Sequence, residues 1–245
     1  MGYSEVYKSW QDDPEAFWMD QANAIDWVKP PSRALNADNA PLYEWFTDAQ
    51  VNACYNAVDR HVENGRADQT AIIYDSPITG KKGTTSFAEL QTQTASLAGA
   101  LRDQGIVSGD RVIIYMPMVP EALVAMLACA RIGAVHSVVF GGFAANELAV
   151  RIDDATPKAI IAASCGVEPG RVVAYKPLLD GAIDLATHKP DFTVILQRDE
   201  GPCDLIAGRD HDWHDVQDGV TPADCVPVSG DHPAYILYTS GTTGA

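Results

Sequence analysis

The sequence predicts an α/β fold with a mostly parallel sheet covered by helices. From residue 51 onward, helix and strand patterns alternate about five times. The strand segments are continuous apolar runs, which is typical of parallel strands buried on both faces. The chain has 245 residues, 47% of them hydrophobic and 20% charged, so its composition is that of a globular protein with one large domain or two small ones.

The first 50 residues predict an irregular, aromatic-rich arm. Four of the five tryptophans of the chain lie here: Trp10, Trp18, Trp27 and Trp45. A helix is expected from Pro14, since proline is favoured in the first turn, whereas the prolines at 30, 31 and 41 break regular structure. We expect residues 1–50 to wrap on the body, residues 51–245, through these tryptophans.

The helices of the body are predicted from apolar spacing and from end signals. Ser86 and Glu89 form a capping box, and Gly105 ends the helix that they open. Pro120 starts an apolar helix that ends at Gly133. The expected helices are residues 52–63, 86–105, 120–132, 146–155 and 176–187.

The strands are predicted where short β-branched and apolar runs lie between these helices. The expected strands are residues 70–74, 110–115, 135–140, 158–163 and 193–196, with a turn at 77–83 after the first. Ligands of parallel α/β folds bind at the carboxyl ends of the strands. The loops that follow the strands are therefore the candidate sites.

Charge and composition exclude several kinds of partner. The chain has 17 Lys and Arg against 33 Asp and Glu, a net charge of −16, which argues against nucleic acid and anionic membranes. No apolar run approaches the roughly 20 residues of a membrane span, and the N-terminus lacks the pattern of a secretory signal. Five widely spaced cysteines predict reduced thiols in the cytoplasm.

The C-terminal residues form the strongest candidate loop. An apolar run, residues 234–238, enters the segment Thr239, Ser240, Gly241, Thr242, Thr243 and Gly244. Glycines let successive N–H groups point at one anion, and hydroxyl groups add donors, so the segment fits a phosphate cradle. Such clusters alone are more often plain loops. Because a domain would not end on its best ligand loop, we expect the chain to be a fragment.

Two further loops follow predicted strands. Phe140, Gly141 and Gly142 could let a flat ligand approach the backbone, although a tight strand–helix turn is the alternative. Arg171 follows the strand 158–163 and could meet a phosphate, although an ion-paired surface arginine is the alternative. Each loop therefore has a structural explanation beside the functional one.

Other features predict no chemistry. The segment 210–215 has the spacing of metal ligands but is expected to be a polar loop without a dedicated metal site. His136 is expected to be a hydrogen-bonded core histidine. Neither a Gly-x-Ser-x-Gly elbow nor a Gly-x-Gly-x-x-Gly fingerprint is present, so hydrolase and dinucleotide functions lack their signatures.

Several segments resemble a known family. Residues 238–244 resemble the signature phosphate loop of the adenylate-forming acyl-CoA synthetases, and residues 138–144 and 149–153 resemble the acetyl/propionyl-CoA synthetase branch. Within that branch, the blocks most similar to the propionyl-CoA synthetases (propionate–CoA ligases) are residues 7–35, 54–61, 115–120, 166–171 and 175–177.

The resemblance implies a two-step ligase. Propionate and ATP with Mg²⁺ would give an acyl-adenylate and pyrophosphate, and coenzyme A would then take the acyl group and release AMP. Residues 239–244 would hold the ATP phosphates. Phe140, Gly141 and Gly142 would lie against the coenzyme A nucleotide, and Arg171 would face its phosphates. The related acetyl enzymes usually have a second arginine where this chain has Glu168.

The same resemblance predicts what this chain lacks. Residues 1–50 would be the N-terminal arm, and residues 51–245 the first part of the AMP-binding (adenylation) domain. The catalytic residues would follow Ala245, with no metal ligands in this segment, so the chain alone should make no acyl-CoA. Small-molecule substrates are the expected partners. The alternatives are an acetyl-CoA synthetase or a non-catalytic nucleotide- or phosphate-binding module.

Overall fold

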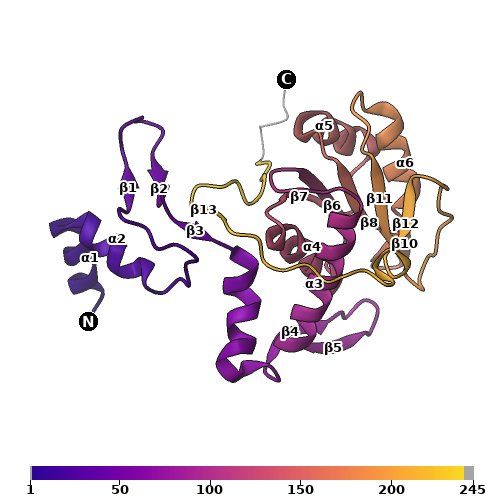
Figure 1. Cartoon of the computed structure of the whole chain (residues 1–245). Helices are drawn as coiled ribbons and strands as arrows, with labels where there is room; N and C mark the ends of the chain where they lie inside the picture. Colours follow the sequence, from indigo (N-terminus) through magenta and orange to yellow (C-terminus); the bar gives the residue numbers. More distant parts are fainter. Residues whose placement is uncertain (1, 240–245) are drawn as a thin grey trace.

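A five-stranded parallel sheet forms the centre of the molecule (Figure 1). The computed structural model describes residues 2–239. The strand order is β12 (Asp210–Asp212), β11 (Phe192–Leu196), β8 (Ala159–Ala163), β6 (Arg111–Met116) and β7 (Val135–Phe140). All residues of β8 and β11 are buried. The prediction of a parallel, doubly covered sheet is confirmed, because continuous apolar runs require neighbours on both faces.

Helices cover both faces of the sheet. They are α3 (Phe87–Asp103), α4 (Pro120–Arg131), α5 (Ala145–Ala155) and α6 (Lys176–Leu185), close to the predicted ranges. Helix α3 packs beside α4, and α5 beside α6. The β6–α4–β7 crossover runs opposite in direction to β7–α5–β8, so right-handed connections place the two pairs on opposite faces. The predicted capping box, formed by Ser86 and Glu89, starts α3.

Four predicted local structures differ from those observed, and three of them lie outside the main sheet. The strand at 70–74 exists as β4 (Thr70–Asp75), but it pairs antiparallel with β5 (Lys82–Ser86) outside the main sheet. The segment predicted as a loop around Arg171 is a hairpin of β9 (Cys165–Glu168) and β10 (Arg171–Ala174). The helical segment at 52–63 has π-helical turns, η1 (Tyr55–Asp59) and η2 (Val62–Arg66).

The polar segment at 210–215 was wrongly predicted to be a loop. Its first three residues form β12, and Asp215–Gln217 form a 3-10 turn, η3. The Asp210 side chain is fully buried, 2.9 Å from Lys176 Nζ and 2.6 Å from Arg209 Nε. Thr193 also donates a hydrogen bond to it at 2.8 Å. Paired charges therefore let a polar sequence form an edge strand.

This network predicts acid sensitivity. Burial alone would raise the pKa of Asp210, but hydrogen bonds from Arg209, Ile206, Lys176 and Thr193 lower it below the ordinary value of 3.8. A depressed pKa gives stability that is complete above about pH 4 and is lost as the pH falls further. We expect Asp210→Asn to flatten the fall in unfolding free energy below pH 4, measured by urea titration. An unchanged pH dependence would contradict this assignment.

The N-terminal arm packs mainly on itself. Figure 1 shows α1 (Tyr3–Asp12), α2 (Pro14–Ala22), β1 (Leu35–Asn36) and β2 (Glu44–Trp45) to one side of the sheet. The ring centroids of Trp18 and Trp45 lie 5.5 Å apart, and those of Trp27 and Phe46 lie 5.4 Å apart. Trp10, Trp18 and Trp45 remain 36–40% exposed. The prediction that the tryptophans pack on the body is wrong, since their aromatic partners belong to the arm.

Two short strands join the arm to the end of the described chain. β3 (Gln50–Val51) pairs antiparallel with β13 (Val228–Ser229). After β13 the chain runs beside β7, where Tyr235 forms a parallel bridge with His136. His136 N donates to Ala234 O at 3.3 Å, and Ile236 N donates to His136 O at 2.9 Å. The last described residues therefore run along β7 toward its carboxyl end.

Candidate functional site

A groove lies at the carboxyl ends of β6 and β7. Its cavity of about 350 Å³ is bounded by the β4–β5 turn, the segment after β6, the β7–α5 turn and β9. A second cavity of about 530 Å³ shares Tyr74, Val119 and Arg198 with it, so the two adjoin. The location is the edge at which parallel α/β folds bind ligands, and it contains two of the predicted site residues, Phe140 and Gly141.

The β7–α5 turn gives Phe140 and the glycines different roles. Phe140 is 69% exposed and lines the groove. A Cβ at Gly141 would lie 2.6 Å from the ring of Tyr175 and 2.8 Å from Met116 O, and Gly142 has a φ of +99°. Close approach and backbone conformation therefore explain both glycines, as in the tight-turn alternative. The exposed Phe140 ring is the part of this turn that is open to a ligand.

Two buried tyrosines fix this turn. Tyr115 donates a hydrogen bond to Phe143 O at 2.9 Å and accepts one from Gly142 N at 3.2 Å. Its ring centroid lies 5.1 Å from that of Tyr175. Burial raises the pKa of Tyr115 to about 12 and also raises the pKa of Tyr175. Both phenols therefore stay protonated near neutral pH and position the Phe140 loop.

Arg171 lies on the exposed β9–β10 hairpin. Its side chain is 70% exposed, and its Nη2 lies 2.6 Å from Glu168 Oε2. A second hydrogen bond joins Nε to the same oxygen at 2.8 Å. Glu168 lines the groove. Glu168 therefore neutralises Arg171, which is the ion-paired surface arginine of the alternative prediction.

Arg198 is a groove residue that the sequence reasoning missed. It lines both cavities, its side chain is 9% exposed, and its Nη1 donates to Cys165 O at 3.0 Å. Lys81 stands nearby, with its Nζ 2.9 Å from Glu200 Oε1. The position of Arg198 just after the strand at 193–196 was the available signal. Three cationic residues, Lys81, Lys82 and Arg198, thus line the two adjoining cavities of an otherwise acidic chain.

The predicted phosphate loop begins beside this edge. Tyr235 is level with His136, so in the same register Thr239 follows at the end of β7 where Phe140 lies. Tyr238 donates a hydrogen bond to Asp154 at 2.6 Å and lies under the Arg151 guanidinium. Ser240, Gly241, Thr242, Thr243 and Gly244 lie outside the described residues. The last described residues therefore run toward the Phe140 turn.

His136 and the possible metal ligands lie away from the groove or differ from their predicted contacts. His136 Nδ1 is buried without a hydrogen-bond partner among the described residues, so the expectation of a hydrogen-bonded histidine is wrong for that atom. Burial lowers the pKa of His136 and favours its neutral form. Within residues 2–239, the group of three possible metal ligands is Cys54, Asp59 and Cys225, none of which lines the groove.

The fold and the cavities together define an α/β protein with a groove at the carboxyl edge of its parallel sheet. The chain belongs to the AMP-binding enzyme family, whose match covers residues 58–245. Residues 3–57 match the acetyl-coenzyme A synthetase N-terminus.

The chain is similar to several acyl-CoA synthetases. It is 52% identical to acyl-CoA synthetase short-chain family member 3, mitochondrial, of Rattus norvegicus, over 95% of this chain and 34% of that protein. It is 42% identical to the propionate–CoA ligase of Escherichia coli, over 100% of this chain and 39% of the ligase. The acetoacetyl-CoA synthetase structure from Streptomyces lividans matches with a TM-score of 0.87 and 26% identity, over 100% of this chain and 37% of that one. The chain thus spans between a third and two fifths of these relatives.

Proposed function

We propose that this chain is the N-terminal part of a short-chain acyl-CoA ligase that converts propionate, ATP and coenzyme A into propionyl-CoA, AMP and pyrophosphate. The observation that carries the proposal is the family match over residues 58–245, together with similarity to a propionate–CoA ligase along the whole chain. The complete ligase would contain this chain and a longer continuation. Residues 1–50 would form its arm and residues 51–245 the first part of its adenylation domain.

The proposed ligand sites follow from the carboxyl edge of the sheet. Backbone N–H groups and hydroxyls of residues 239–244 would hold the ATP phosphates, with Mg²⁺ offsetting their charge. The exposed Phe140 ring would stack on the nucleotide of coenzyme A, with Gly141 and Gly142 beneath it, because aromatic side chains stack well on bases. Arg171 would face the phosphates of coenzyme A after exchanging its Glu168 partner for them.

Acetate is the second candidate substrate. The acetyl-coenzyme A synthetase of Streptomyces coelicolor is also 42% identical to this chain. The preference for propionate rests on the similar sequence blocks at 166–171 and 175–177. The ratio of kcat/KM for propionate to that for acetate, measured with the complete ligase, decides between the two.

The proposed location is the cytoplasm. The odd number and wide spacing of the five cysteines favour a reducing compartment. The mitochondrion is the alternative compartment, because the mammalian relatives are named as mitochondrial proteins. Among residues 2–239, every helix is too short or too polar to cross a membrane. Fractionation of the producing cells tests the cytoplasmic assignment.

Removing donors from the phosphate loop should damage the first half-reaction. In the complete ligase, we expect Gly241→Ala or Thr242→Val to lower propionate-dependent ATP–pyrophosphate exchange by roughly 10²-fold, as for loss of a preorganised donor. Gly83→Ala is the control, because a Cβ there meets nothing within 4 Å. Wild-type exchange in both loop variants would refute the assignment and favour a different phosphate site.

The Phe140 assignment has a complementary outcome in the same enzyme. Phe140→Ala should raise the KM for coenzyme A and leave pyrophosphate exchange unchanged, because that exchange needs no coenzyme A.

The 245-residue chain alone should form no propionyl-CoA. Turnover by that chain would show that it holds the chemistry itself, and no turnover by the complete ligase would favour a non-catalytic nucleotide-binding module.

A further inference from the structure

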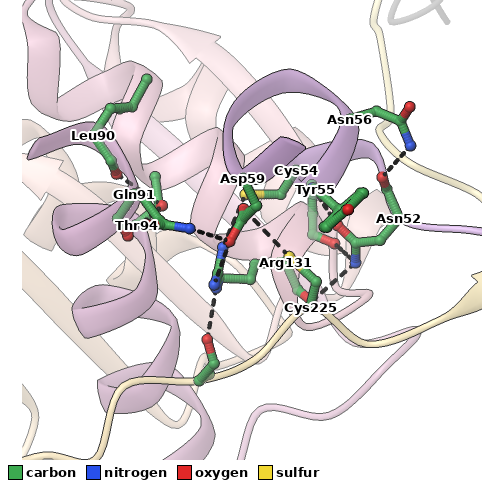
Figure 2. A network of polar contacts seen from close by, with 12 residues as sticks. Asn52, Cys54, Tyr55, Asn56, Asp59, Leu90, Gln91, Thr94, Arg131 and Cys225 are labelled. Carbon is green, nitrogen blue, oxygen red and sulfur yellow. Dashed lines mark hydrogen bonds and ion pairs between the residues drawn. The ribbon is translucent and has the colours of Figure 1, made fainter. Parts of the chain in front are cut away.

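Two cysteine side chains from distant parts of the sequence lie close together beside Arg131 at the end of α4. Cys54 precedes η1, and Cys225 lies in the segment that returns from η3 to β13. Figure 2 shows both side chains beside Asp59 and Arg131. The two sulfur atoms and a carboxylate oxygen of Asp59 all lie within 4.8 Å of one another. Cys54 is fully buried, whereas Cys225 is partly exposed. Cys225 is therefore the member of the pair that lies nearer to solvent.

The charges around the two sulfur atoms differ. Arg131 Nη1 lies 3.6 Å from Cys54 Sγ, and the Cys225 thiol donates to Asp59 Oδ2 at 3.6 Å. A hydrogen bond from Cys225 and the positive charge of Arg131 lower the pKa of Cys54. The hydrogen bond to Cys54 and burial raise the pKa of Cys225. Cys54 is therefore the thiol of the pair that ionises first.

The same groups disfavour a metal cation. Both carboxylate oxygens of Asp59 are held by Arg131, at 2.7 and 2.9 Å, and Gln91 donates to Asp59 at 2.8 Å. A dication bound to Cys54 and Asp59 would lie beside the guanidinium and would have to displace it. Thiol chemistry fits this arrangement better than a metal site.

We propose that Cys54 and Cys225 form a modification site that a hydroperoxide oxidises to a disulfide. The Cys54 thiolate attacks the peroxide, forming an S–O bond and breaking the O–O bond, and the leaving oxygen takes up the proton that Cys54 released and departs as water or an alcohol. The Cys225 thiol then attacks the Cys54 sulfur. An S–S bond forms, the S–OH bond breaks, and the departing hydroxide takes up the proton of Cys225 and leaves as water. Two thiols are oxidised and one peroxide is reduced.

The two sulfur atoms already lie close together. An S–S bond is about 2.05 Å long, so the sulfur atoms must approach by less than 3 Å from their upper limit. The neighbours hold both segments in place: Val226 N donates to Arg131 O at 2.8 Å, and Asn52 Nδ2 donates to Val226 O at 2.8 Å. The bond would tether the segment that leads to β13 and onward to the phosphate loop.

The test is peptide mapping of the folded 245-residue chain. Treatment with hydrogen peroxide, alkylation of the remaining thiols and digestion without reductant should give one cross-linked peptide that contains Cys54 and Cys225. Dithiothreitol should release it. Cys54→Ser and Cys225→Ser should each abolish the cross-link, whereas Cys129→Ser, which removes another buried thiol, should leave it.

Two outcomes would overturn the proposal. One is oxidation of Cys54 or Cys225 to sulfinic acid in the wild-type chain with no Cys54–Cys225 peptide. The other is stoichiometric binding of Zn²⁺, added alone to the reduced chain, that protects both thiols from alkylation. The mapping uses the unmodified chain, so the proposal stays testable even if the serine variants fail to fold. It makes no use of ligase activity and is independent of the proposed function.

Discussion

Arg131→Met should lower the free energy of unfolding by roughly 3–5 kcal/mol, because it leaves a buried carboxylate without its charge partner. Arg131 and Asp59 are 6% and 7% exposed. Arg131 also donates through Nε to Ala223 O at 2.6 Å. After the substitution, Gln91 and Cys225 would be the remaining side-chain donors to Asp59 among the bonds in this cluster. Urea denaturation measures the loss.

Two comparisons test whether the loss of stability comes from the burial of the Arg131–Asp59 pair. Arg171→Met removes the exposed partner of Glu168 and should change stability by less than about 1 kcal/mol. The double variant Arg131→Met/Asp59→Leu should recover part of the loss, because no unpaired charge remains buried. An Arg131→Met variant as stable as Arg171→Met would contradict the prediction.

Gly166→Ala should destabilise the chain by roughly 1–3 kcal/mol through overpacking. Its Cβ would lie 2.1 Å from Tyr175 Oη and 2.4 Å from Cζ. Tyr175 is 5% exposed and lies against Tyr115 and Gly141, so its ring has little room to move. The ring would press on the β7–α5 turn, and the groove beside Phe140 would change shape.

A double-mutant cycle checks the cause. Tyr175→Ala removes the overlapping ring and leaves a cavity. If the overlap is the cause, Gly166→Ala should cost much less in that background than in the wild type. Gly83→Ala, which meets nothing within 4 Å, should be neutral. Additive costs of Gly166→Ala and Tyr175→Ala would show that the clash is relieved elsewhere.

The sequence predicted the elements whose signals are local. Continuous apolar runs identified β6, β7, β8 and β11, and Ser86 with Glu89 placed the start of α3. The sequence did not predict β12, because its residues are polar and resemble a loop. The charge of Asp210 is paired with Lys176, which is distant in the sequence. The sequence-based prediction also failed for the tryptophans, since a count of aromatic residues does not say which surface they contact.

The part of the candidate site that depends on local sequence signals could be predicted. Phe140 and Gly141 follow a strand and were found from their position. Arg198 and Tyr175 were missed, because their relation to the groove depends on which strands are neighbours. An ion-paired surface Arg171 was the alternative prediction, and the structure confirms it; the partner, Glu168, was not identified although the pair has ordinary i, i+3 spacing, because the segment was interpreted as a loop.

The buried contacts of Arg131 and Asn52 have a consequence for folding order. The bond from Arg131 to Ala223 spans 92 residues of sequence, and that from Asn52 to Val226 spans 174. Closing such long loops costs entropy before any contact offsets it. The returning segment should therefore dock after the sheet has formed, and substitutions there should mainly speed unfolding, with little effect on the refolding rate.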